Sequence, residues 1–211
     1  LYVAQAKGYY KAEGIDMTIN PGGPNLNAES LVASGADTFA VGGGTESSLA
    51  ARDKNLPIST IAMLHQRTPY VYVVLTDSPI KTIQDFKGKK ITTFFTGAQH
   101  TLYAIMRKNG MQPTDASVAA QGVSMTRDTL ITNDRVVAER PKVVQGFLNA
   151  TLRGWKYAIQ HQAEAVDIVM AAAPGLDKAH QTAMLAEAAR LMVADAGGSQ
   201  GLGALDMARL K

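Results

Sequence analysis

A strand–turn–helix unit stands at residues 38–48, with the sequence Thr38-Phe39-Ala40-Val41-Gly42-Gly43-Gly44-Thr45-Glu46-Ser47-Ser48. The apolar run predicts a buried strand, and the glycines permit a tight turn. Thr45 or Ser47 then begins a helix that ends at Asn55, and a second buried strand is expected at 58–64. Helices of about ten residues between short strands predict right-handed crossovers and a parallel sheet, so the predicted fold class is α/β.

The alternation of short helices and strands continues on both sides of this unit. On the N-terminal side we expect a helix from Tyr2 to Glu13 that ends at Gly14, followed by a half-buried strand at 15–19. The C-terminal third differs, because Pro141 begins the most clearly amphipathic helix of the chain. The other predicted elements are a helix capped by Asn25 that runs through Ser34, one helical turn over 83–86, helices over 101–108, 163–173 and 177–196, and strands over 71–75 and 91–95.

Composition excludes several classes of protein. Of 211 residues, 46% are hydrophobic and 18% charged, which rules out a largely disordered chain and suits one or two domains. The net charge is +3, and the densest basic cluster is only Lys87, Lys89 and Lys90, so we expect no nucleic-acid partner. The chain has no cysteine, which excludes thiol nucleophiles, thiolate metal sites and disulfides. No apolar run approaches the ~20 residues that span a bilayer.

Two strand-to-helix turns are the candidate ligand sites, Gly42–Ser48 and Thr96–Thr101. In open α/β sheets, ligands bind beyond the carboxyl ends of strands, where helix N-termini present free N–H groups and a partial positive charge. Neither turn matches a phosphate-loop or dinucleotide-binding motif. The alternative is that both turns are ordinary helix caps, although two similar turns in one chain favour a ligand held between them.

Side chains near these turns add further candidates. Glu46 either supports the N-terminus of its own helix or points inward, where it would repel an anion and favour a ligand with N–H donors. His65 follows a predicted strand and His100 lies in the second turn, whereas His161 and His180 are expected on solvated helix surfaces. We expect no catalytic residue, no metal ligand and no cofactor. The predicted ligand contacts are Gly43, Gly44, Thr45, Glu46, Ser47, His65, Gln66, Thr96, Gly97, Ala98, Gln99 and His100.

Several segments, taken in order, form a pattern known from another group of proteins. The first is Ala4-Gln5-Ala6-Lys7-Gly8-Tyr9-Tyr10-Lys11-Ala12-Glu13-Gly14-Ile15-Asp16. It resembles the A-x-x-x-G-[YF]-[YF]-x-x-E-G-[LI]-[DN] signature of the NMT1/THI5-like family of solute-binding proteins. The similarity covers most of residues 2–160. It continues through Pro21-Gly22-Gly23-Pro24, Leu31-Val32-Ala33-Ser34-Gly35-Ala36-Asp37, Gln66 with Pro69, Ile83-Gln84-Asp85-Phe86-Lys87-Gly88-Lys89-Lys90-Ile91 and Glu139-Arg140-Pro141-Lys142-Val143-Val144-Gln145-Gly146-Phe147-Leu148-Asn149-Ala150.

The resemblance implies a type 2 periplasmic-binding-protein fold, in which two α/β lobes joined by a hinge close on a small molecule. Such proteins deliver ligand to an ABC importer and are not enzymes. Family ligands include thiamine pyrimidine precursors, riboflavin, alkanesulfonates, taurine and nitrate. The two turns fall where this fold faces its cleft, one in each lobe. We expect a thiamine-type pyrimidine ahead of alkanesulfonate, taurine and nitrate, because Glu46 and the Pro-Gly-Gly-Pro turn favour it.

The chain also departs from the family pattern. The family's first strand would lie before Leu1, and Gly122-Val123-Ser124 passes at once into Met125-Thr126-Arg127-Asp128-Thr129-Leu130-Ile131-Thr132, which resembles the strand that returns to the first lobe. We therefore expect an incomplete N-terminal strand, an incomplete second lobe with residues missing near 123–125, and a clipped C-terminus. The expected division is lobe 1 over 1–76, lobe 2 over 77–126, and the return to lobe 1 with the C-terminal helices over 127–211.

Location and partners follow from the same resemblance. We expect a monomer that is periplasmic, or extracellular and lipid-anchored, with a signal peptide outside this chain. Its partners would be the ligand and an ABC transporter permease, with membrane contact only through that permease or an N-terminal anchor. Two alternatives remain: a pyrimidine synthase, which in this family uses iron and a cysteine-rich motif, and the ligand-sensing domain of a transcription regulator.

Overall fold

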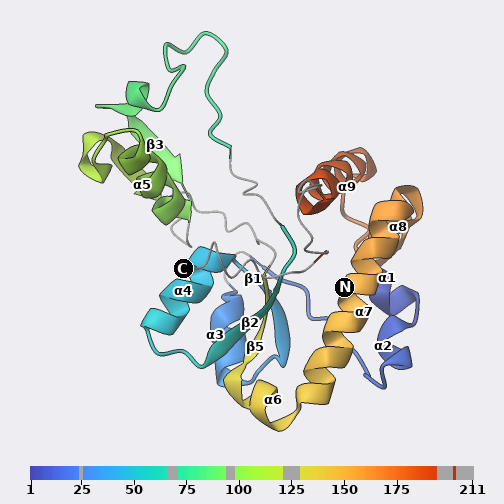
Figure 1. The fold of residues 1–211 in the computed structure, drawn as a ribbon. Coiled ribbons are helices and arrows are strands. Elements are labelled where there is room, and N and C mark those ends of the chain that lie inside the picture. The colour runs from blue at the N-terminus through green and yellow to red at the C-terminus, as the bar shows by residue number, and fades with distance from the viewer. Residues whose placement is uncertain (24–25, 66–70, 94–97, 121–128, 194–201, 203–211) are drawn as a thin grey trace.

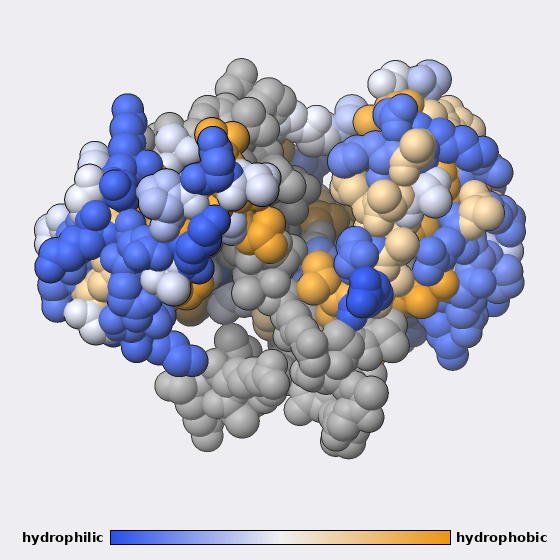
Figure 2. Space-filling view, turned by 90° about the horizontal axis from the view of Figure 1, so that it is seen from above, coloured by the Kyte–Doolittle hydropathy of each residue, from blue (hydrophilic) through white to orange (hydrophobic). Residues whose placement is uncertain are grey.

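The structure is a computed structural model that describes residues 1–23, 26–65, 71–93, 98–120, 129–193 and 202. Figure 1 shows two bodies: a larger one around a three-stranded sheet, and a smaller one that carries β3 and α5 and stands beyond α4. Seen from above, hydrophilic residues dominate the outer faces of both bodies, and hydrophobic residues gather toward the middle of the view (Figure 2). Within the described ranges, no helix has the length and apolar character needed to span a membrane.

The larger body is built on a sheet with the strand order β1-β5-β2. Its strands are β1 (Phe39–Gly42), β2 (Ile58–Met63) and β5 (Thr129–Asn133), and β5 runs antiparallel to both neighbours. The prediction of a parallel sheet is therefore wrong here. β1 and β2 do point the same way, but the returning strand lies between them, and local sequence patterns predict strands without predicting their partners.

Helices cover the sheet and enclose its core. α3 (Ala28–Ser34) begins at Asn27, whose side chain accepts a hydrogen bond from the Ser30 amide at 2.7 Å, and ends at Gly35 with φ +81°. The sequence predicts the same C-terminus but places the N-cap at Asn25, two residues early. α4 (Thr45–Asp53) follows β1 directly, as the sequence predicts. Val32 of α3 packs with Ile58 and Ile131 of the sheet, and all three are buried.

A second cluster joins the N-terminus to the long C-terminal helix α7 (Pro141–Gln160). The Phe147 ring stacks on Phe39 at 3.9 Å between centroids and on Tyr10 at 5.9 Å. The Tyr10 hydroxyl lies 2.8 Å from Thr151 Oγ1, and burial raises the pKa of Tyr10. α6 (Asp134–Glu139), α8 (Gln162–Ala172) and α9 (Lys178–Val193) complete this end of the chain.

The N-terminal segment differs from its prediction in two ways. The expected helix over 2–13 is two short helices, α1 (Tyr2–Ala6) and α2 (Tyr9–Ala12), because Gly8 adopts φ +71° between them. Residues 15–19 form no ladder with any described strand. The Gln5 side-chain carboxamide donates to the Met17 carbonyl at 2.8 Å instead, so these residues alternate between half-buried and exposed without a strand partner.

The smaller body contains a parallel pair, β3 (Lys90–Thr93) and β4 (Ser117–Ala120), connected through α5 (Ala98–Lys108). The sequence predicts the strand and the helix of this unit, over 91–95 and 101–108, but β4 is absent from the predicted elements. One 3₁₀ turn, η1 (Gln84–Phe86), precedes β3, and a second, η2 (Pro113–Asp115), lies between α5 and β4. The core of the smaller body holds Phe86, Leu102 and Met106.

The strand predicted at 71–75 does not form among the described residues. Tyr72 packs edge-on against Phe86 at 5.8 Å between ring centroids, whereas Val71 and Val73 are 79% and 87% exposed. An apolar β-branched run has strand propensity, but a strand also needs a hydrogen-bonding neighbour.

Candidate functional site

The structure brings the two predicted turns into contact. Glu46 lies in the first turn of α4 and Thr101 in the first turn of α5, and the Thr101 hydroxyl donates to Glu46 Oε1 at 2.6 Å. These residues are 55 positions apart and belong to different bodies of the molecule. The N-termini of two helices therefore meet at one point, with a carboxylate between them.

The first turn is shaped by glycine. Gly44 is the N-cap of α4 and adopts φ +108°, a conformation that side chains rarely tolerate. α4 has no side-chain cap, and helix geometry leaves its first N–H groups without intrahelical acceptors. A Cβ added to Gly42 would lie 2.8 Å from Thr129 Oγ1, so that position also excludes a side chain.

A buried carboxylate holds this turn from behind. Glu29 of α3 is 5% exposed, and its Oε1 accepts hydrogen bonds from the Gly43 amide at 2.9 Å and the Ser47 hydroxyl at 2.6 Å. Gly43 and Ser47 are predicted ligand contacts, and in this structure both donate to Glu29. The turn is thus organised around a negative charge placed behind it.

Three strand ends meet beside the turn. Thr129, at the start of β5, is paired with Gly42 at the end of β1 and with Met63 at the end of β2. The Thr45 hydroxyl contacts Met63 Sδ at 3.8 Å. Because β5 is antiparallel to its neighbours, its amino end shares this edge with the carboxyl ends of β1 and β2, where α/β sheets bind ligands.

The remaining predicted ligand contacts lie near this edge of the sheet, in the first turn of α5, or outside the residues that the structure describes. His65 is half-buried just after β2. In α5, Ala98 is the first residue, Gln99 is half-buried, and its Nε2 lies 3.3 Å from Nε2 of the exposed His100. Gln66, Thr96 and Gly97 lie outside the described residues.

The two other histidines lie on the surface, as the sequence predicts. Both His161 and His180 are exposed, and the His161 ring stacks on Tyr157 at 4.1 Å between centroids. In the part of the chain that the structure describes, no three His, Asp or Glu side chains gather closely enough to hold a metal ion.

Four residues at this edge are absent from the predicted set: Glu29, Met63, Thr101 and Thr129. Glu29 was missed because an acid in the first turn of a helix usually serves its own helix. Thr101 belongs to the predicted second turn, so the sequence already indicated that it lies close to the candidate site. Nothing in the local sequence indicates that Met63 and Thr129 lie side by side, because strand β5 is more than 60 residues away.

The arrangement favours one kind of ligand chemistry. Two carboxylates, Glu29 and Glu46, stand at the N-terminus of α4 and offset the partial positive charge of that helix. An anion placed there would meet two like charges at short range. A ligand with amino or ring N–H groups would instead find a carboxylate acceptor next to the N–H groups of a helix N-terminus.

Comparison with known proteins places the chain in a family. The model of the family described as NMT1/THI5 like matches residues 1–127 and 116–165. The chain belongs to this family. Among solved structures, the aliphatic sulphonate binding protein SsuA of Escherichia coli aligns with a TM-score of 0.69 at 15% identity, over 87% of this chain and 73% of that one. SsuA of Xanthomonas axonopodis pv. citri, bound to MOPS, gives 0.67 over 87% and 78%. The NMT1/THI5-like chain therefore has the periplasmic-binding-protein fold, as the sequence predicts.

Relatives in sequence carry two kinds of name. The riboflavin-binding protein RibY of Chloroflexus aurantiacus is 26% identical over 214 aligned residues, which cover 79% of this chain and 60% of RibY. The 4-amino-5-hydroxymethyl-2-methylpyrimidine phosphate synthase of Legionella pneumophila is 23% identical over 83% of this chain and 70% of its own length. The chain thus spans less than two thirds of RibY. About 167 residues of this chain, 79% of 211, take part in the alignment of 214 positions. About 47 residues of RibY within the aligned region therefore lie opposite gaps in this chain.

Proposed function

We propose that this chain is the substrate-binding protein of an ABC importer, and that it holds a small polar organic molecule between its two bodies. The hydrogen bond from Thr101 to Glu46 carries the proposal, because it brings the helix N-termini of both bodies to one point. Two facing helix ends on separate bodies are suited to close on a ligand by hinge motion. Membership of the NMT1/THI5-like family and the name of RibY support the same role.

The proposed division of the chain follows its path through the two bodies. Residues 1–76 form the first part of lobe 1, residues 77–126 form a shortened lobe 2, and residues 127–211 return to lobe 1. The position of β5 between β1 and β2 supports the return. We place the protein in the periplasm, or outside the cell on a lipid anchor, as a monomer that docks on a permease.

The ligand that we propose is a thiamine-type pyrimidine, ahead of alkanesulfonate, taurine or nitrate. Its amino group would donate to Glu46, while backbone N–H groups at Gly44–Ser47 and Gly97–Gln99 bind its ring nitrogens. His65 or Gln66 would orient it. The charge of Glu29 and Glu46 at the α4 N-terminus supports an N–H-donating ligand over an anion.

The proposed activity is binding without catalysis. Relatives named as pyrimidine phosphate synthases make an enzyme the competing function. The synthase chemistry that the resemblance implies uses a cysteine-rich motif, and these 211 residues contain no cysteine.

Calorimetric titration tests the proposal. The panel holds 4-amino-5-hydroxymethyl-2-methylpyrimidine, riboflavin, taurine, ethanesulfonate and nitrate. We expect the pyrimidine to bind and to be recovered unchanged after incubation. Glu46→Gln should weaken its binding about 5- to 150-fold, which corresponds to the ~1–3 kcal/mol that a buried donor loses when it is left without its acceptor.

The matched control is Asp53→Asn, which removes the same charge from the exposed far end of the same helix α4 and should leave binding unchanged. Tighter binding of ethanesulfonate than of the pyrimidine would overturn the ligand class. No binding across the panel would overturn the function, and conversion of the pyrimidine would establish an enzyme.

A further inference from the structure

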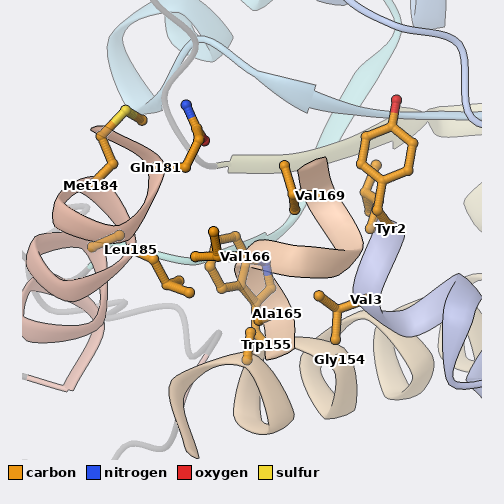
Figure 3. Close-up of a pocket in the computed structure, with 13 residues that line it drawn as sticks. Tyr2, Val3, Gly154, Trp155, Ala165, Val166, Val169, Gln181, Met184 and Leu185 are labelled. Atoms are coloured by element: carbon orange, nitrogen blue, oxygen red, sulfur yellow. The ribbon is translucent and has the colours of Figure 1, made fainter. Parts of the chain in front are cut away.

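A cavity of about 260 Å³, partly open to solvent, lies among helices α1, α7, α8 and α9 (Figure 3). None of the twelve predicted ligand contacts lines it, and none of the residues at the α4–α5 contact does. Its lining is therefore separate from the α4–α5 contact, and three of its helices, α1, α7 and α8, lie across the three-stranded sheet from the smaller body (Figure 1).

The cavity exists because small residues line the space where the four helices diverge. Gly154, Ala158, Ala165 and Ala188 all face it, and none fills it. The walls also resist closure. α1 already touches α7 so closely that a Cβ on Gly154 would lie 2.6 Å from the Ala4 Cβ. These two helices therefore cannot move nearer to each other to remove the void.

The lining is apolar and converges on one point. Figure 3 shows Trp155 of α7, Val166 of α8 and Leu185 of α9 turned toward a shared space, with Val169 and Met184 around it. None of the thirteen lining side chains is charged. Gln181 supplies a carboxamide at the edge of the cavity.

We propose that this cavity is a binding site for a small, uncharged, ring-containing apolar molecule. An apolar cavity of ~150 Å³ already binds benzene, so 260 Å³ has room for a substituted single ring. A flat ring would lie against the Trp155 indole and the branched side chains of Val166 and Leu185. A single polar substituent would face the Gln181 carboxamide. The site is independent of the pyrimidine cleft.

Trp155 provides a direct readout, because it is the only tryptophan of the chain. Toluene is the probe, titrated into the purified protein with excitation at 295 nm, where toluene does not absorb. We expect a saturable change in the emission of Trp155, together with a higher melting temperature at saturation.

Two matched pairs of variants locate the binding. Ala188→Leu fills the cavity from α9 and should weaken toluene binding at least about tenfold, whereas Ala183→Leu adds the same side chain to an exposed site on the same helix. Ala165→Leu and exposed Ala163→Leu repeat the comparison on α8, should Ala188→Leu fail to fold.

Each outcome decides the proposal. A saturable response in the wild type and in the exposed variants, lost in the cavity variants, supports the site. Linear, unsaturable quenching in the wild type overturns it, as does an equal response in all variants, which would mean adsorption elsewhere. The result does not depend on pyrimidine binding, so this proposal and the proposed function fail separately.

Discussion

Glu29 is the residue whose removal tests most directly how the candidate site is built. Replacement by alanine leaves the Gly43 amide without the acceptor that now lies at 2.9 Å, and it removes the 2.6 Å acceptor of the Ser47 hydroxyl. The Ser47 hydroxyl retains a second acceptor, the Gly44 carbonyl at 3.0 Å. The main loss is therefore one charge-assisted hydrogen bond and the weakening of another, in a site where Glu29 is 5% exposed.

The magnitude follows from these contacts. A hydrogen bond to a charged group contributes ~1.5–3 kcal/mol, so Glu29→Ala should lower the free energy of unfolding by about 2–4 kcal/mol. This is a large share of the ~5–15 kcal/mol that stabilises a typical domain. Glu29→Gln keeps an oxygen acceptor at the same place and should cost about half as much. Urea denaturation followed by far-UV circular dichroism measures both values.

The control is Glu139→Ala, which removes an exposed carboxylate whose recorded partner is Arg135, one turn away at 3.5 Å. Such pairs contribute ~0.2–0.5 kcal/mol, so this variant should stay close to the wild type. The reasoning is refuted when Glu29→Ala changes the free energy of unfolding no more than this control does. Equal losses for alanine and glutamine would show that charge, rather than the acceptor geometry, holds the turn.

Two further predictions concern other parts of the fold. Gly154→Ala should destabilise the protein by about 1–3 kcal/mol, because its Cβ would lie 2.6 Å from that of Ala4. Gly146→Ala in the same helix has contacts no shorter than 3.2 Å and should be much milder, and equal effects in thermal denaturation would contradict the geometry. The pKa of Asp85 is lowered from 3.8 because its carboxylate accepts from the Lys81 amide, the Thr82 amide and the Thr82 hydroxyl. The contribution of Asp85 to the free energy of unfolding is therefore present above its unfolded-state pKa and is lost as pH falls through the lower folded-state pKa. A carboxyl NMR titration of the folded protein measures that lower pKa, and a value of 3.8 or higher would contradict the prediction.

Local sequence was sufficient for the elements whose signals are local. The Gly35 cap of α3, the start of α7 at Pro141 and the succession of strand β3 and helix α5 all follow from residues close together in the chain. The α/β class and the family are determined in the same way, since glycine turns, caps and helix periodicity act over a few residues.

Tertiary structure decided what depends on distant partners. No local pattern states that β5 enters between β1 and β2, or that residues 71–75 and 15–19 form no strand with their described neighbours. The site shows the same division. Glycine and hydroxyl residues in the sequence indicate where the two turns lie. The carboxylates that accept hydrogen bonds from these turns are distant in the chain: Glu29 is 14 residues before Gly43, and Glu46 is 55 residues before Thr101. A hydrogen bond needs two groups within about 3 Å, and only the folded chain sets that distance.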